Sequence, residues 1–382
     1  MNSKPHVVYV VNQDWFFLSH RLPVARAARR VGARVTVIAA DSGRAEAIRA
    51  EGLDFVRLPL SRRGANPVDE VWALSRLLRL YRRLQPDLIH HVTLKPVLYG
   101  SLAARLVSHA AVVNAVAGFG YSLTSTELRA RLIRPLVKQL CRVALRHPRS
   151  QTIFQNPEDR DDFIRMGLVP PAQAVLIRGS GVNCSVFRPT PHPDGDPIVV
   201  LASRMLWDKG VPEFVAAAAL ARTRGVRARF VLVGAPDPGN PRAIPVPRLE
   251  AWSREGVVEW WGPRDNMADV LSRASVAVLP TVYGEGIPKV LLEAAASGRP
   301  IVATDVRGCR EIVRPGVNGI LVRPHDRVAL ANAMTTLVES PELRRRFGQA
   351  GRDLAVREFT EELVVSRTLD VYSDLLGERW PR

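Results

Sequence analysis

The sequence predicts an α/β protein made of two doubly wound domains, each a parallel sheet covered by helices. Short β-branched apolar runs alternate with helical patterns along the chain, which is typical of parallel sheets. The alternation stops in a proline-rich stretch after Phe187 and restarts at Ile198. A chain of 382 residues also exceeds one simple core. We therefore expect domains over 1–188 and 196–382, with the last helix, about 360–377, packing back on the N-terminal domain.

In the N-terminal half, the strands are short runs rich in valine, isoleucine and other apolar residues, and longer amphipathic segments separate them. The runs predict strands over 7–11, 34–39, 55–59, 88–91, 112–116 and 152–155. The segments between them predict helices over 18–31, 67–84, 97–107 and 128–146.

The C-terminal half repeats the pattern after the linker sequence RPTPHPDGDP. Strands are predicted over 198–202, 229–233, 258–261, 276–279, 301–304 and 319–322. Helices between them include 211–224, 267–273 and 329–338. In sheets of this kind, ligands bind at the carboxyl ends of the strands.

Composition excludes several classes of protein. With 47% hydrophobic and 24% charged residues, the chain is typical of a globular protein, and no apolar run approaches the roughly 18 residues of a membrane span. The first apolar run is too short for a signal peptide, so we expect a cytoplasmic protein. The three cysteines, Cys141, Cys184 and Cys309, match neither a disulfide framework nor a zinc motif.

The net charge of +17 is concentrated in the N-terminal half. Residues 1–190 carry 28 basic and 13 acidic side chains, whereas the remainder carries 26 and 24. Within the predicted helix 128–146, four cations repeat every fourth residue, with apolar neighbours: Arg134, Lys138, Arg142 and Arg146. Such a stripe suits an anionic membrane surface, and the alternative is an ordinary solvated helix face.

The strongest functional signal lies between Pro280 and Arg310. A loop ending in Gly286, followed by Pro288 at the predicted first helical position, leaves backbone N–H groups directed at an anion. Glu293 follows among apolar residues, where an unpaired carboxylate is costly to bury. Glu293 is therefore expected to hold a ligand, unless the segment is simply an amphipathic helix with a solvated glutamate.

The pair Glu285 and Glu293 resembles the E-x7-E signature of retaining glycosyltransferases of family 4, which implies the GT-B architecture and a nucleotide-diphosphate sugar as donor. The resemblance covers nearly the whole chain. It implies that Glu285 faces the sugar and that Glu293 faces the ribose hydroxyls. The neighbouring positions that it assigns to donor binding are Gly286, Ile287, Pro288 and Val290.

Two cations precede this pair by about eighty residues, in the segment SRMLWDKG. Arg204 and Lys209 follow a predicted strand, where they could straddle a diphosphate. The resemblance assigns them to the donor diphosphate and its leaving-group charge, so we group them with Glu285 as catalytic. It also places Gly234, Gly262 and Arg264 near the nucleotide base and ribose.

The acceptor is expected in the N-terminal domain, where VNQDWFFLSHRLP places Ser19, His20 and Arg21 at the predicted start of the first helix. A helix start with an arginine suits an acceptor phosphate, and the alternative is a hydrophobic staple capped by Ser19. With GFGY at 118–121, these strings resemble the subgroup that transfers N-acetylhexosamine to undecaprenyl-diphosphate-linked sugars. The chain departs from many family members at Ala117, where they have a histidine, so no acid or base role is carried over.

No metal site is predicted. Asp159 and Asp161 imitate a D-x-D motif, but Asn156 as a helix cap explains them better, and His90 and His91 would point to opposite faces of a strand.

We therefore expect a retaining glycosyltransferase that moves a hexose or N-acetylhexosamine from a UDP-sugar, UDP-GalNAc being favoured, to a lipid-linked saccharide. It would work without a cofactor or metal, peripherally on the inner face of the plasma membrane. The alternatives are a UDP-sugar epimerase of similar architecture and a basic nucleic-acid-binding protein. The second is disfavoured because the basic residues lack interleaved aromatics and any known module.

Overall fold

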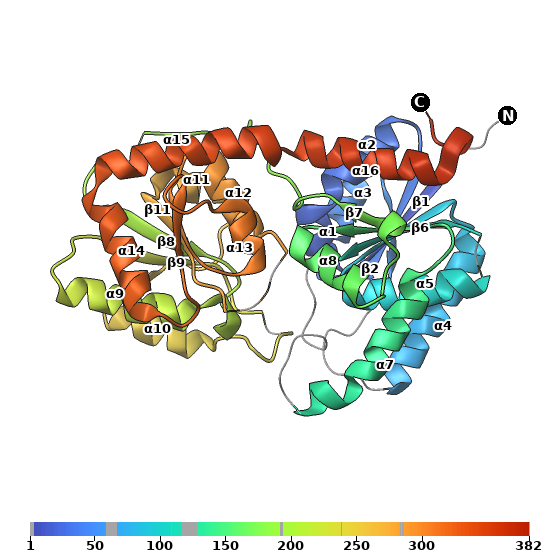
Figure 1. The fold of residues 1–382 in the computed structure, drawn as a ribbon, viewed down its shortest axis with the longest axis horizontal. Coiled ribbons are helices and arrows are strands. Elements are labelled where there is room, and N and C mark those ends of the chain that lie inside the picture. The colour runs from blue at the N-terminus through green and yellow to red at the C-terminus, as the bar shows by residue number, and fades with distance from the viewer. Residues whose placement is uncertain are drawn as a thin grey trace. The chain divides into compact units, whose positions relative to one another are not determined.

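The computed structural model describes residues 4–58, 67–107, 109–116, 128–191, 194–237, 239–282, 284 and 286–381. The chain forms two compact units (Figure 1). Unit 1 comprises Met1–Ser180 together with Glu362–Arg382, and unit 2 comprises Gly181–Glu361. Each unit is one parallel sheet with helices on both faces, so the predicted fold class is confirmed.

Unit 1 holds a seven-stranded sheet in the order β3-β2-β1-β4-β5-β6-β7. Its strands are β1 (His6–Gln13), β2 (Arg34–Ala40), β3 (Asp54–Arg57), β4 (Leu88–Val92), β5 (Ala111–Val116), β6 (Ser150–Phe154) and β7 (Ala174–Leu176). From β1 the chain first adds strands on one side and then returns to add β4 on the other. The switch point of this sheet therefore lies between β1 and β4, where doubly wound folds bind ligands.

The helices of unit 1 are α1 (Asp14–His20), α2 (Leu22–Arg30), α3 (Ala45–Ala50), α4 (Pro67–Leu84), α5 (Leu94–Val107), α7 (Leu128–Leu145), α8 (Pro157–Arg165) and α16 (Glu361–Leu376). On one face of the sheet, side chains of α1, α2, α3 and α16 share a core with β1, β2 and β4. On the other face, α4, α5, α7 and α8 cover the strands. From Glu362 onward α16 belongs to this unit, and its Tyr372 is fully buried there.

Unit 2 holds a six-stranded parallel sheet in the order β10-β9-β8-β11-β12-β13. Its strands are β8 (Ile198–Ala202), β9 (Arg229–Val233), β10 (Glu259–Trp260), β11 (Val276–Leu279), β12 (Ile301–Thr304) and β13 (Gly319–Val322). Its helices are α9 (Val211–Thr223), α10 (Val246–Arg254), α11 (Met267–Arg273), α12 (Lys289–Ala296), α13 (Arg307–Ile312), α14 (Arg327–Glu339) and α15 (Pro341–Glu358). The switch point lies between β8 and β11.

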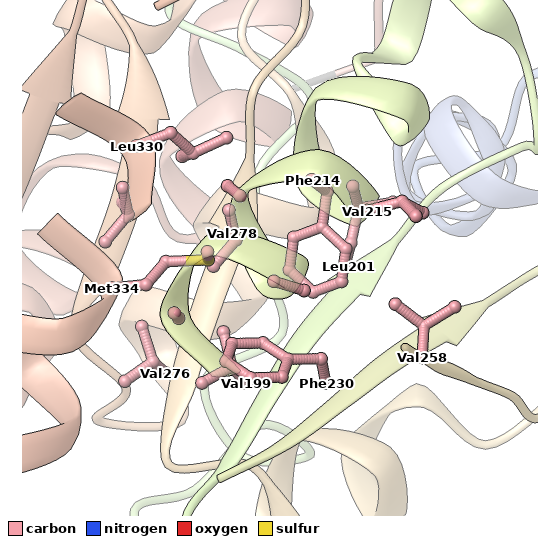
Figure 2. Packing of buried hydrophobic residues seen from close by; sticks show 14 of the residues in the cluster. Val199, Leu201, Phe214, Val215, Phe230, Val258, Val276, Val278, Leu330 and Met334 are labelled. Carbon is pink, nitrogen blue, oxygen red and sulfur yellow. The ribbon is translucent and has the colours of Figure 1, made fainter. Parts of the chain in front are cut away.

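The core of unit 2 explains how its strands are held. Side chains that alternate along β8 and β11, such as Leu201 and Val278, pack against Phe214 of α9 and Met334 of α14 (Figure 2). The opposite face packs on α11, α12, α13 and α15. Both faces are buried, which is why these strands are continuous apolar runs in the sequence.

The structure differs from the predicted elements mainly at the start of the chain. The single helix expected over 18–31 is two helices, because the chain bends at Arg21, which separates α1 from α2. Pro23 lies in the first turn of α2, where a missing N–H costs nothing. The helix α10, Val246–Arg254, was not among the helices predicted.

Candidate functional site

The loops that follow β8 and β11 interlock at the switch point of unit 2. Val282 donates its backbone N–H to the carbonyl of Asp208 at 3.0 Å, and the Thr281 hydroxyl donates to the same carbonyl at 3.1 Å. Gly210 has φ of +74°, and a Cβ there would lie 1.9 Å from the carbonyl oxygen of Pro280. Only glycine fits this approach, so the two loops are held together by their backbones.

A second glycine joins the loops after β8, β9 and β10. Gly234 has φ of +136°, and a Cβ would lie 1.8 Å from the carbonyl oxygen of Ser203. Its N–H donates to the carbonyl of Gly262 at 2.9 Å, and its own carbonyl accepts from Trp260 Nε1 at 2.9 Å. Gly234 and Gly262, both predicted donor positions, therefore belong to one backbone framework. Arg264, two residues further on, is exposed after an edge strand.

The two predicted catalytic cations lie in the loop after β8. Lys209 is half-buried and ends a single turn of 3-10 helix, Trp207–Lys209, directly before Gly210. The Arg204 guanidinium donates to the Asp237 carboxylate at 2.8 Å, from a side chain that is 39% exposed. The sequence did not single out Asp237, which lies in a proline-rich stretch after β9. Its position in the loop after β9, the strand next to β8, could have indicated a contact with Arg204.

Glu293 is the buried carboxylate of this region. It lies in α12 with 9% of its surface exposed, and no hydrogen bond or ion pair reaches its carboxylate in the described part of the chain. Burial raises the pKa of Glu293 from 4.5 to about 7; Lys289 opposes this change and Glu361 adds to it. Glu293 is therefore buried among apolar neighbours, and the ligand expected for it stays a prediction.

The helix α12 begins one residue later than the sequence predicts. Pro288, predicted as the first helical residue, has an extended backbone and directly precedes Lys289, where the helix begins. Gly286, Ile287 and Pro288 are buried, and Val290 is half-buried. Glu285 falls outside the described residues, so its predicted role stays a prediction.

The structure places the predicted acceptor residues Ser19 and His20 at the end of a helix and Arg21 in the interior of unit 1. Ser19 and His20 end α1 instead of beginning a helix, so the expected helix start at Ser19 is wrong. The Ser19 hydroxyl lies 2.6 Å from His20 Nδ1, and the His20 ring stacks on Phe16 with centroids 4.0 Å apart. Arg21 is 5% exposed, and burial lowers the pKa of its guanidinium. The Arg21 side chain is buried because it faces the core of unit 1 instead of its surface.

The core near Arg21 contains a chain of buried hydroxyls. Tyr9 and Tyr372 lie 2.8 Å apart through their hydroxyl oxygens, and the Tyr372 hydroxyl lies 2.6 Å from His90 Nδ1. His91 turns to the opposite face, where its Nε2 lies 2.9 Å from the Tyr81 hydroxyl. The expectation that the two histidines point apart is confirmed.

Three residues of the basic stripe lie on α7 and Arg146 directly follows the helix, and the four differ in their contacts. Arg146 donates to the carbonyl of Gly167 at 2.9 Å, and Arg142 donates to the same carbonyl at 3.3 Å. Both cations therefore satisfy carbonyls just beyond the end of α8. Lys138 is half-buried, and the side chain of Arg134 lies outside the described part. Exposed Leu136 and Val143 lie on the same helix.

No group of three or more histidine, cysteine, aspartate or glutamate side chains within the described ranges is placed to hold a metal ion. At the imitation D-x-D motif, the Asp159 N–H donates to Asn156 Oδ1 at 2.7 Å. The predicted helix cap is therefore confirmed.

Comparison with known proteins identifies the class. The family model described as glycosyl transferase 4-like matches residues 6–156, and the model described as glycosyl transferases group 1 matches residues 196–340. Sucrose-phosphate synthase of Thermosynechococcus elongatus has a similar fold, with a TM-score of 0.80, 19% identity and coverage of 98% of this chain and all of that one. Anabaena HepE in complex with UDP-glucose gives a TM-score of 0.78 at 18% identity, with 97% and 99% coverage. The fold is therefore GT-B.

The two matches together span most of both units, and the chain belongs to the glycosyltransferases, with a 4-like N-terminal domain and a group 1 C-terminal domain. A similar full-length relative is the N,N'-diacetylbacillosaminyl-diphospho-undecaprenol alpha-1,3-N-acetylgalactosaminyltransferase of Campylobacter jejuni. It is 27% identical over 381 residues, which cover 94% of this chain and 98% of the relative.

Proposed function

We propose that the chain transfers an N-acetylhexosamine, with UDP-GalNAc as the favoured donor, to an undecaprenyl-diphosphate-linked sugar, with retention of anomeric configuration. The observation that carries the proposal is the arrangement at the switch point of unit 2. There, the loop bearing Arg204 and Lys209 is fastened to the loop that leads to α12 and its buried Glu293. The similarity to the Campylobacter jejuni relative supports the choice of donor and acceptor.

Transfer of a glycosyl group breaks the bond between the anomeric carbon and the diphosphate, and negative charge develops on the departing UDP. Arg204 can bind the diphosphate through two N–H groups, and Lys209 adds a compact positive charge. Asp237 holds the Arg204 side chain in one orientation before the ligand arrives. The N-terminal N–H groups of α12 add partial positive charge on the same side. These groups would do the work of a divalent ion, so we propose that donor binding is metal-independent.

Glu293 would accept hydrogen bonds from the ribose hydroxyls. An ionised carboxylate with no protein partner gains more from such donors than one that is already paired. Following the family resemblance, Glu285 would position the donor sugar.

We further propose that unit 1 binds the acceptor and docks on the anionic inner face of the plasma membrane, while unit 2 binds the nucleotide sugar. None of the described helices is long and apolar enough to cross a bilayer. The cations of α7 and the exposed Leu136 and Val143 support a peripheral contact, because cations attract anionic headgroups and apolar side chains enter the interface.

The transfer reaction can be tested with a panel of UDP-sugars and a synthetic short-chain polyprenyl diphosphate carrying N,N'-diacetylbacillosamine. UDP release and a labelled, solvent-extractable product are expected with UDP-GalNAc, in buffer containing a chelator. Conversion of one UDP-sugar into another without an acceptor would instead indicate an epimerase. Loss of transfer in the chelator would overturn metal independence.

The membrane contact can be tested by liposome co-sedimentation at low and high salt. Changing Arg134, Lys138, Arg142 and Arg146 to glutamine should nearly abolish binding, since each cation near such a surface contributes about 1 kcal/mol. Arg142 and Arg146 also bind carbonyls after α8, so the pair Arg134 and Lys138 should be changed separately to isolate the membrane effect. Undiminished sedimentation of the four-fold variant would leave the stripe as a solvated face.

A further inference from the structure

The switch point of unit 1 carries polar side chains that the proposed site does not use. In this sheet β1 pairs with β4 in parallel, and the last paired residues are Val11 and Val92. Asn12, within β1, and Thr93, the first residue after β4, come next at the carboxyl ends of these two strands. Because the strands are paired up to Val11 and Val92, Asn12 and Thr93 lie near each other at this edge of the sheet. This is the position at which doubly wound sheets bind ligands.

Each of the two side chains buries an oxygen that has no hydrogen-bond partner among the described residues. Asn12 Oδ1 and Thr93 Oγ1 are both shielded from solvent. A buried polar atom left unpaired costs about 1–3 kcal/mol. Two such atoms at the carboxyl ends of adjacent strands, where doubly wound sheets bind ligands, indicate a ligand-binding site.

Thr93 also has an unusual backbone. Its φ is +73°, a left-handed conformation that is rare for a β-branched residue. The strain is maintained by two hydrogen bonds: its N–H donates to the Ala115 carbonyl at 3.2 Å, and its carbonyl accepts from the Val97 N–H at 3.0 Å. Strain of this kind costs about 1–3 kcal/mol and is concentrated at functional sites.

Side-chain hydrogen bonds hold His91, which lies in β4 two residues before Thr93. His91 lies with its Nδ1 2.9 Å from Asn114 Oδ1, and the Ser101 hydroxyl donates to the same oxygen at 2.9 Å. Gly100 leaves room for the His91 ring, since a Cβ there would lie 2.2 Å from its Nε2. The strand that leads to Thr93 is therefore anchored by buried polar contacts.

We propose that Asn12 and Thr93 form a subsite for a hydroxyl or amide group of the acceptor sugar. This rests on the proposed function, because it assumes a saccharide acceptor. A sugar hydroxyl both donates and accepts, so one group could donate to Asn12 Oδ1 and pair with the Thr93 hydroxyl. The acceptor phosphate would be bound elsewhere, because neither residue is charged.

The test compares two threonines whose buried hydroxyls are both unpartnered. Thr93 lies at the switch point, and Thr152 lies within β6. Thr93→Val and Thr152→Val each replace the hydroxyl by a methyl group of similar size. Because no protein partner is lost, both variants should keep the melting temperature. Acceptor KM, direct binding of the short-chain acceptor and UDP affinity are measured for each, together with Asn12→Ala and the conservative Thr93→Ser.

We expect Thr93→Val and Asn12→Ala to raise the acceptor KM and Kd about threefold to tenfold, the effect of one hydrogen bond. UDP affinity should be unchanged, and Thr93→Ser and Thr152→Val should behave as the wild type. Equal effects of the two valine substitutions, or an acceptor Kd within twofold of the wild type in Thr93→Val and Asn12→Ala, would overturn the subsite.

Assays of the wild-type protein distinguish a failure of the proposed function from a failure of the proposed subsite. If it elongates a different saccharide from a membrane extract, the proposed acceptor is wrong, and the same variants are compared on that saccharide. If it binds UDP but neither binds nor elongates any saccharide, both the proposed acceptor and the subsite are overturned.

Discussion

Changing Glu293 to glutamine should make the free protein more stable at alkaline pH and weaken its binding of UDP. The side chain is buried and has no hydrogen-bond partner among the described residues, so ionising it in the folded chain is costly. The pKa of Glu293 is raised from 4.5 to about 7 by burial. At about 1.4 kcal/mol for each pKa unit, this difference corresponds to about 3 kcal/mol of folding free energy.

The sign follows from where each state releases the proton. Below pH 4.5 both folded and unfolded chains hold it, and the stability is fully present. As the pH rises toward 7, the unfolded chain ionises first, so the free energy of unfolding falls by about 3 kcal/mol and the loss is complete above pH 7. Glutamine cannot ionise. Glu293→Gln should therefore match the wild type at pH 4 and exceed it at pH 8.

With UDP present the order should reverse. Ribose hydroxyls would donate to the ionised carboxylate, and charge-assisted bonds are worth about 1.5–3 kcal/mol, so the variant should lose roughly tenfold or more in UDP affinity. Urea unfolding at pH 4, 6 and 8, with and without UDP, measures both effects. Glu213→Gln is the matched control, because Glu213 is also 9% exposed but lies 3.2 Å from His325 Nδ1. A Glu293→Gln variant less stable than the wild type at pH 8 without UDP would refute the reasoning.

Three further changes test the site and its support. Arg204→Ala or Lys209→Ala should lower turnover about a hundredfold with folding intact, which circular dichroism and steady-state kinetics would check; near-normal turnover would remove that residue from the site. Gly210→Ala places a methyl group against the Pro280 carbonyl and should weaken UDP binding in calorimetry; wild-type affinity would contradict the fastened-loop geometry. Burial alone would raise the pKa of Asp14, but hydrogen bonds from the loop after β2 lower it, so their stabilisation is present at neutral pH and is lost as the pH falls. In urea unfolding, Asp14→Asn should then lower the free energy of unfolding by about 2 kcal/mol at pH 7 and by much less at pH 3. An equal loss at both pH values would show that the negative charge of Asp14 is not the cause.

The sequence predicts most of the fold because its sheets are buried on both faces. The runs 7–11 and 198–202 are continuous and apolar, and both lie within observed strands. In unit 2 the main site residues also follow from local pattern, since glycines and cations after a strand mark a ligand loop. Glu293 is apparent from its apolar neighbours alone.

The features that escaped prediction depend on contacts between distant parts of the chain. Nothing near Arg21 in the sequence indicates that its side chain turns inward. Tyr372, whose electrostatic interaction with the buried Arg21 accompanies this placement, lies about 350 positions later. The left-handed backbone of Thr93 is maintained by hydrogen bonds to Ala115 and Val97, and threonine itself gives no local sign of it. Asp237 lies between two prolines after β9, where the sequence predicts no helix or strand and gives no sign of its contact with Arg204.

The burial of α16 in unit 1 affects the order in which the chain can fold during synthesis. Unit 2 is continuous, whereas unit 1 needs the last helix to cover Tyr9 and His90. A ribosome releases the N-terminal segment first, yet that segment must wait for the whole of unit 2 before its core is complete. Until then its apolar surface needs protection, for example by a chaperone. Removing the final twenty residues should therefore destabilise unit 1 more than unit 2.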